Sequence, residues 1–161
     1  MGTTLYTNQF SQSVAVGDLD LEIMKQGSIV GIVSPNQSSP AASIGSGAFV
    51  KIDTTITSGY VINFLQCAVG DLAFGVVRRL VKQGSFVNPQ AIEVSLPTAP
   101  VIWLLTTGTV TPGATVYSDA TGAYVTVTQG TGKSRGIALD YGLTGTVVRV
   151  MITAPFGIAT A

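Results

Sequence analysis

The chain has 161 residues, with eight basic and eight acidic side chains, one cysteine and no histidine. Only 10% of the residues are charged, so nucleic-acid binding through a surplus of lysine and arginine on one face is not expected. A single cysteine excludes an intramolecular disulfide, and the lack of histidine excludes cysteine and histidine zinc sites and histidine-dependent catalytic triads.

The first 33 residues are predicted to form an N-terminal arm and the first strands. Residues 1–13 are polar apart from Leu5, Tyr6 and Phe10, too few apolar side chains for a segment that folds alone. The segment is either an arm that docks on a neighbouring molecule, or a frayed terminus or first strand, because chain ends are ordered only when they are tied down.

The segment 18–24 alternates strictly between acidic and apolar residues, the two-residue period of a strand. Asp18, Asp20 and Glu22 fall on one face of this strand. Three carboxylates on one face could bind a divalent cation, but such a site needs ligands that converge from other segments. The favoured interpretation is a solvated face whose charges protect a sheet edge.

A second strand is predicted over residues 28–33, and the proline-, serine- and glycine-rich stretch 34–47 is predicted to be a flexible loop. The loop separates the N-terminal portion from a predicted β-barrel domain over residues 48–153. Residues 154–161 are predicted to form a C-terminal tail.

Three of the eight basic residues, Arg78, Arg79 and Lys82, lie within five positions of one another. The cluster could meet an acidic surface on a partner. So small a cluster is more often a solvated strand end, and this is the favoured interpretation.

The run Val101–Leu105 is continuously apolar and predicts a strand buried on both faces, with Trp103 in the core. Residues 130–134 end like a phosphate-binding loop, but Val127 stands where that loop needs a glycine, and the chain continues as a strand. We interpret the segment as a hairpin turn. No window shows the spacing of a long helix, and we find no tandem repeat.

The stretch from Gly113 to Ile152 organises the chain. Valines alternate with threonines over residues 125–128, and apolar residues also recur at every second position over 148–152. Turn residues separate these runs, and we interpret the stretch as a meander that closes a β-barrel or sandwich. The fold is therefore predicted to be all-β, as a single barrel-like or sandwich-like domain. The predicted strands cover residues 18–24, 28–33, 48–53, 60–67, 73–81, 91–96, 101–106, 114–118, 123–128, 135–140 and 146–152.

The mean hydropathy of +0.48 is high, yet no stretch approaches the roughly 18 apolar residues of a membrane span. A chain so apolar and so weakly charged is expected to cover part of its surface in an assembly. The sequence gives no positive evidence for catalysis, and no cofactor is predicted.

Five short motifs occur in an order and spacing that resemble those of a known protein family. They are Gly47-Ala-Phe-Val-Lys, Phe74-Gly-Val-Val, Gly113-Ala-Thr-Val-Tyr-Ser-Asp, Gly136-Ile-Ala-Leu-Asp and Gly145-Thr-Val-Val-Arg-Val-Met-Ile. Over residues 45–153 this order and spacing resemble the capsid decoration, or cement, proteins of tailed bacteriophages.

The resemblance implies a β-barrel that binds the outer surface of the phage head after synthesis in the host cytoplasm. It implies the major capsid protein as partner, reinforced contacts between capsid subunits, and commonly a homotrimer. The family has no catalytic residues to transfer. Composition and hydropathy, and not the resemblance, predict that nucleic acid and membrane are not partners. Residues 1–33 match the family pattern less well, so the candidate contacts with the capsid or with other subunits come from the residues themselves: Leu5, Tyr6, Phe10, Arg78, Arg79 and Lys82.

An alternative from the binding class is a head-fibre or carbohydrate-binding module, which would expose aromatic side chains on loops. Tyr117, Tyr124 and Tyr141 lie in or beside predicted turns and could serve this purpose.

Overall fold

The structure is a computed structural model that describes residues 27–38, 41–57, 59, 61–78, 84–96 and 101–152. These residues form strands and turns without a helix, so the prediction of an all-β chain is confirmed. The strands are β1 (Ser28–Val33), β2 (Ser43–Gly45), β3 (Phe49–Ile52), β4 (Asn63–Gln66), β5 (Gly75–Val77), β6 (Ser85–Val87), β7 (Ala91–Ser95), β8 (Val101–Leu105), β9 (Thr115–Ser118), β10 (Val125–Thr126), β11 (Ser134–Ala138) and β12 (Val147–Met151).

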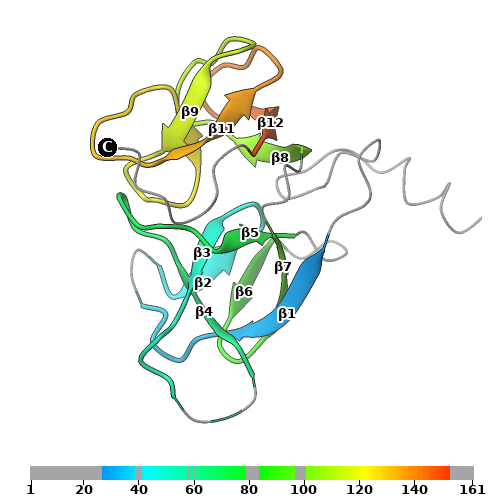
Figure 1. The fold of residues 1–161 in the computed structure, drawn as a ribbon, viewed down its shortest axis with the longest axis vertical. Coiled ribbons are helices and arrows are strands. Elements are labelled where there is room, and N and C mark those ends of the chain that lie inside the picture. Colours follow the sequence, from blue (N-terminus) through cyan, green and yellow to red (C-terminus); the bar gives the residue numbers. More distant parts are fainter. Residues whose placement is uncertain are drawn as a thin grey trace, which may run out of the picture.

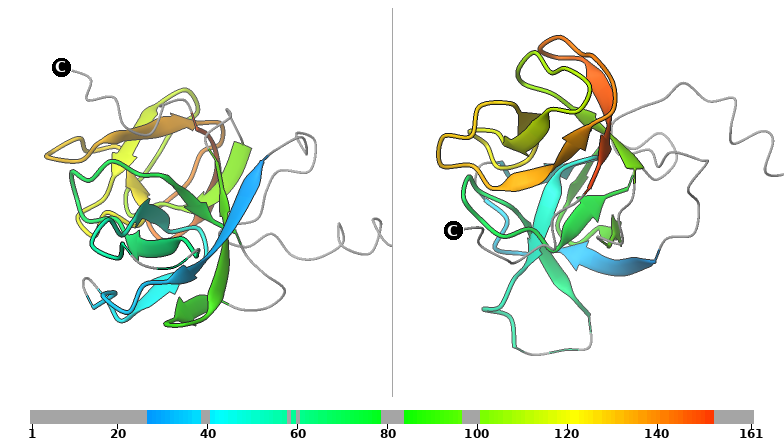
Figure 2. Two further views of the ribbon diagram at one scale, coloured as in Figure 1. Left: turned by 60° about the horizontal axis from the view of Figure 1, so that its bottom comes forward. Right: turned by 45° about the horizontal axis from the view of Figure 1, so that its top comes forward.

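The strands form two lobes that lie one above the other in Figure 1 and remain adjacent in both views of Figure 2. The first lobe, residues 28–95, is a closed barrel in the order β1-β4-β3-β5-β7, with β2 and β6 paired beside it. Strand β1 closes the barrel because it pairs antiparallel with β7 and parallel with β4. The second lobe, residues 101–152, is a five-stranded sheet in the order β10-β9-β11-β12-β8.

The second lobe corrects two predictions. The stretch 113–152 is not a simple meander, because β11 pairs with β9 and not with β10, its predecessor in the chain. Residues 130–134 therefore do not form a hairpin turn. They contain a turn at Gly130 and belong to the connection from β10 to β11. These two strands lie on opposite sides of β9.

Two further predictions about strands are corrected by the structure, and a third concerns residues that it does not describe. The predicted loop 34–47 contains β2, which pairs with β6, another strand that the sequence did not indicate. Strand β8 is not buried on both faces, because Trp103 and Leu105 keep partial exposure while Ile102 and Leu104 are buried. The predicted strand 18–24, with Asp18, Asp20 and Glu22, lies outside the described residues.

The two lobes repeat one arrangement, which corrects the expectation that the chain has no repeat. Strands β1, β4, β3, β5 and β7 correspond in order to β8, β10, β9, β11 and β12. The isolated bridge Thr106–Val125 links the ends of the second sheet where Val33–Phe64 joins β1 to β4 in the first lobe. The register of β1 on β7 (Ser28 with Ser95 through Ile32 with Ala91) recurs for β8 on β12 (Val101 with Met151 through Leu105 with Val147).

Backbone hydrogen bonds repeat as well. The amide of Gly47 donates to the Val77 carbonyl at 2.8 Å, and the amide of Gly113 donates to the Ala138 carbonyl at 2.8 Å. Both glycines have positive φ, which favours glycine at the entry to β3 and to β9. The segments 47–55 and 113–121 share the pattern Gly-Ala-x-Val-x-x-Asp-x-Thr. The second lobe is thus a shorter version of the first.

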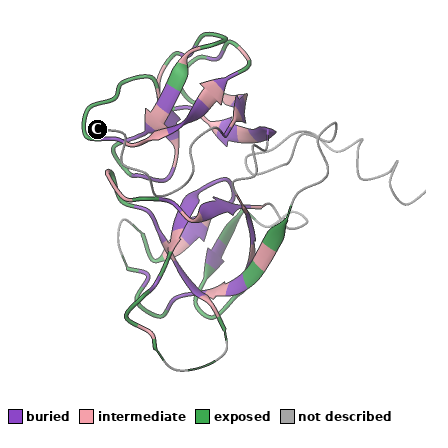
Figure 3. Ribbon diagram, in the orientation of Figure 1, coloured by how far each residue is buried: buried purple, intermediate pink, exposed green. Residues whose placement is uncertain are grey.

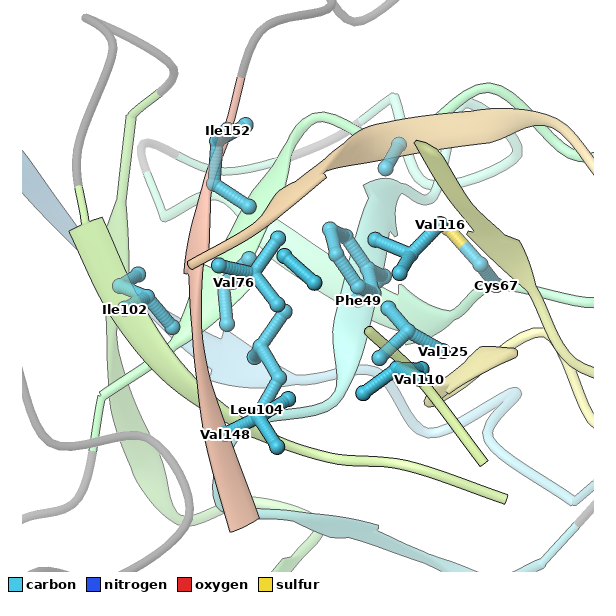
Figure 4. Packing of buried hydrophobic residues seen from close by; sticks show 13 residues of the cluster. Phe49, Cys67, Val76, Ile102, Leu104, Val110, Val116, Val125, Val148 and Ile152 are labelled. Atoms are coloured by element: carbon cyan, nitrogen blue, oxygen red, sulfur yellow. The ribbon is translucent and has the colours of Figure 1, made fainter. Parts of the chain in front are cut away.

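The lobes share a core. Phe49 and Val76 belong to β3 and β5, but they point out of the first barrel into a buried cluster formed mainly by the second lobe (Figure 4). In return, Ala123 of the second lobe belongs to the core of the first. Phe49 and Val76 each contribute roughly 1.5–3 kcal/mol relative to full exposure. Both buried clusters therefore contain residues of both lobes, and these contacts hold the lobes together.

Candidate functional site

The described part of the chain contains no group of three or more histidine, cysteine, aspartate and glutamate side chains that could hold a metal ion. Among the same residues, no helix has the length and apolar character needed to cross a membrane. The lone cysteine, Cys67, is buried, and burial raises its pKa to about 12, so the thiol stays protonated at neutral pH.

One polar network stabilises the fold. The buried carboxylate of Asp53 accepts hydrogen bonds from Ser34 Oγ at 2.6 Å, Asn36 Nδ2 at 2.9 Å and Thr55 Oγ1 at 2.7 Å. These donors, led by Ser34, hold the pKa of Asp53 far below its usual value although burial opposes them. Ser34 and Asn36 follow β1 and Thr55 follows β3, so the network connects the turn after β3 to the segment after β1.

Three ion pairs join charged side chains at the surface of the described residues. Lys51 Nζ lies 2.7 Å from Asp71 Oδ2, and Arg149 forms a two-pronged ion pair with Asp140. Of the predicted basic cluster, Arg78 pairs with Glu93, and its amide donates to the Glu93 carbonyl. Exposed pairs of this kind contribute about 0–1 kcal/mol each.

The other predicted contact residues lie outside the described part of the chain. They are Leu5, Tyr6 and Phe10 of the predicted arm, with Arg79 and Lys82 of the basic cluster.

Large apolar side chains also reach the surface. Tyr141 and Leu143 are 60% and 54% exposed and lie in the connection between β11 and β12. Val30 on β1 is 65% exposed. Of the three tyrosines that an aromatic binding surface would use, Tyr141 projects from a loop, whereas Tyr124 packs against the first core and Tyr117 lies within β9.

A surface that sequence reasoning missed lies on the second lobe, where buried and partly exposed residues alternate along β12 (Figure 3). Ile137 of the neighbouring strand β11 is also partly exposed. Arg149 sits over the Trp103 ring, with its guanidinium carbon 5.7 Å from the ring centroid. The continuous apolar run Val101–Leu105 hid this surface, because the side chains that face solvent depend on strand pairing.

The family model of the phage cement proteins matches residues 31–153. The chain belongs to this family. Cement proteins are structural proteins of the phage virion, which agrees with the resemblance carried by the motifs between Gly47 and Ile152. A search of curated protein sequences gives no match.

This cement protein also has a likeness among solved structures. The N base of head fiber protein gp8.5 from bacteriophage phi29 superposes with a TM-score of 0.55. The match covers 80% of this chain and 94% of that chain at 10% sequence identity. At this identity the likeness shows a shared fold, and the site must be argued from the residues of the cement protein itself.

Proposed function

We propose that this cement protein binds the outer surface of a phage head and reinforces contacts between major capsid protein subunits. The observation that carries the proposal is the family match over residues 31–153. The role is structural and not catalytic. The surface that the described residues form is consistent with it, because its charges are largely paired and exposed apolar side chains remain for contacts.

Self-association as a homotrimer is part of the proposal. The high apolar content and the low charge favour an assembly, and closed rings give every subunit the same interface. The number three comes from the family resemblance alone.

We place the anchors of attachment in the N-terminal arm, with Leu5, Tyr6 and Phe10 as apolar contacts. Each such side chain gains about 1.5–3 kcal/mol on full burial, while ordering roughly ten residues costs a comparable amount. One arm alone therefore binds weakly. Three arms on one trimer can raise the avidity by about 10² to 10⁴ over a single site. Attachment should also resist moderate salt, because few charges are available for it.

The test uses undecorated heads and two proteins, the full chain and a variant that lacks residues 2–12. The full chain should bind the heads and slow their disruption by heat, and the deletion should weaken binding while trimerisation, measured separately by light scattering, persists. Unchanged binding by the deletion variant would move the anchor to the loop 34–47 or to the cluster of Arg78, Arg79 and Lys82. Failure of the full chain to bind any head would reject capsid attachment.

The likeness to the phi29 head-fiber base favours a second candidate, a base that holds a fibre on the virion. A carbohydrate-binding module of the same kind would use exposed aromatics such as Tyr141. Electron microscopy of decorated heads separates these candidates, since a fibre base leaves a projecting fibre and a cement protein alone does not.

A further inference from the structure

The repeated lobes provide an internal comparison of equivalent surface positions. On the second lobe, six apolar side chains point outward, five from three neighbouring strands and one, Leu139, from the position directly after β11, and all of them keep partial or full exposure. We call this set the second-lobe face: Trp103, Leu105, Ile137, Leu139, Val147 and Met151. The strands lie side by side in the order β11-β12-β8, so the set forms one continuous surface.

The first lobe does not carry the same surface. At the positions that match the second-lobe face in strand register, it has Val30, Ile32, Val76, Arg78, Ala91 and Ser95. Arg78 thus replaces Leu139, Ala91 replaces Val147 and Ser95 replaces Met151. Because the two lobes share one scaffold, the fold does not require large apolar side chains at these positions.

The second-lobe face is electrically neutral. Its central cation, Arg149, donates from Nε to Asp140 Oδ2 at 3.0 Å and from an amino nitrogen to Asp140 Oδ1 at 2.9 Å. Part of the guanidinium also covers the ring of Trp103. A second copy that contacts this face therefore meets no unpaired charge at its centre.

The chain itself shows that this fold can cover outward-facing strand residues with another copy of the fold. Val76 is the first-lobe counterpart of Ile137 and points out of its barrel, yet the second lobe buries it together with Phe49. In the second lobe Ile137 keeps partial exposure. Within one chain, outward-facing residues of this fold are therefore already covered by a second copy of the same fold.

We propose that the second-lobe face is the surface through which one chain binds a second copy of the same chain. The proposal rests on the self-association part of the proposed function and assigns that contact to named residues. Capsid attachment is left to other surfaces.

The test exchanges second-lobe residues for their first-lobe counterparts, which the scaffold already accommodates. The variants are Val147→Ala combined with Met151→Ser, and Leu139→Arg. The matched control, Val30→Ser combined with Ile32→Ala, removes apolar surface from the corresponding place on the first lobe. Sedimentation equilibrium at micromolar concentrations measures association, and circular dichroism confirms folding.

We expect the second-lobe variants to weaken self-association by about tenfold or more, while the control associates like the original chain. A monomeric original chain, or folded second-lobe variants that associate normally, would overturn the proposal. A chain that associates through this face but binds no head would leave this proposal standing and reject capsid attachment.

A measurement on the unaltered protein keeps the proposal testable if the variants do not fold. Trp103 is the only tryptophan. Its side chain should become less accessible to the quencher acrylamide as the protein concentration rises through the association range, so the quenching of its fluorescence should decrease. Quenching that does not change while the protein associates would show that the copies meet elsewhere.

Discussion

Arg135 is a buried cation at the junction of the lobes. It is 2% exposed, its guanidinium carbon lies 4.7 Å from the centroid of the Phe49 ring, and an amino nitrogen donates to the Asp71 carbonyl at 3.2 Å. Burial lowers its pKa, because a charge is costly where water is excluded. The register of β11 on β9 shifts between Ser134 and Gly136, so Arg135 lies at a β-bulge. From there its guanidinium contacts Phe49 and Asp71 of the first lobe.

Asp53 should make stability depend on acid. Its pKa is depressed in the folded state, so the stabilisation is present above the unfolded pKa of about 4 and is lost as the pH falls toward the folded value. Asp53→Asn removes the charge and should lower the free energy of unfolding by about 2 kcal/mol at pH 7. The difference between the original chain and the variant should shrink below about pH 4.

Urea unfolding at pH 7, 5 and 3 measures this difference. Asp140→Asn is the control, because it breaks a partly exposed ion pair with Arg149 and should cost less than about 1 kcal/mol at pH 7. A stability difference for Asp53→Asn that stays constant across the three conditions would contradict the assignment.

At the scale of elements, one glycine in each lobe allows two strands to pair closely. A Cβ on Gly136 of β11 would lie 2.2 Å from the Met151 carbonyl oxygen, and one on Gly75 of β5 would lie 2.5 Å from the Ser95 carbonyl oxygen. Ser95 and Met151 are equivalent residues of β7 and β12. Both lobes therefore need a residue without a side chain at this crossing.

Gly75→Ala and Gly136→Ala should each lower the free energy of unfolding by about 1–3 kcal/mol, the usual cost of overpacking. Gly84→Ala is the control, since its Cβ would have no atom within 4 Å, and it should change stability by less than about 0.5 kcal/mol. Thermal unfolding of the three variants decides the matter. If one glycine tolerates alanine as Gly84 does, the strands can separate there and the close crossing is not required.

The sequence predicted strands where alternation and turn residues agree, as at β1, β7 and β12. It missed β2 and β6, because three residues are too few to show a period. The order β10-β9-β11 could not be predicted, since pairing between strands is not a local property. The repeat stayed hidden because segments 47–55 and 113–121 share only five of nine residues and the connections between strands differ in length.

The candidate site was less accessible to sequence reasoning than the fold. Exposure of Tyr141 agrees with its position beside a predicted turn, but the second-lobe face required the register of β8 on β12. The alternation over 148–152 separates Val148 and Val150 from Val147 and Met151, but it does not show which residues of β8 and β11 lie beside Val147 and Met151.

For the whole molecule, the shared cores predict that the lobes unfold together. Phe49 of the first lobe is fully buried in the second-lobe cluster, and Ala123 of the second lobe is buried in the first-lobe cluster. Unfolding one lobe would expose both sets of contacts, so a partly unfolded chain loses stabilisation on each side. This favours a single cooperative transition.

Phe64→Ala tests this coupling, because Phe64 is buried in the first-lobe core while Trp103 reports on the second lobe. The substitution should lower the free energy of unfolding by about 3–5 kcal/mol. In urea, the midpoint from Trp103 fluorescence should fall together with the midpoint from circular dichroism. Val148→Ala, in the core of the second lobe, is the reciprocal variant and should move both midpoints as well. If Phe64→Ala leaves the Trp103 midpoint in place while circular dichroism shows two steps, the lobes are independent folding units, and the buried contacts of Phe49 and Ala123 do not couple them.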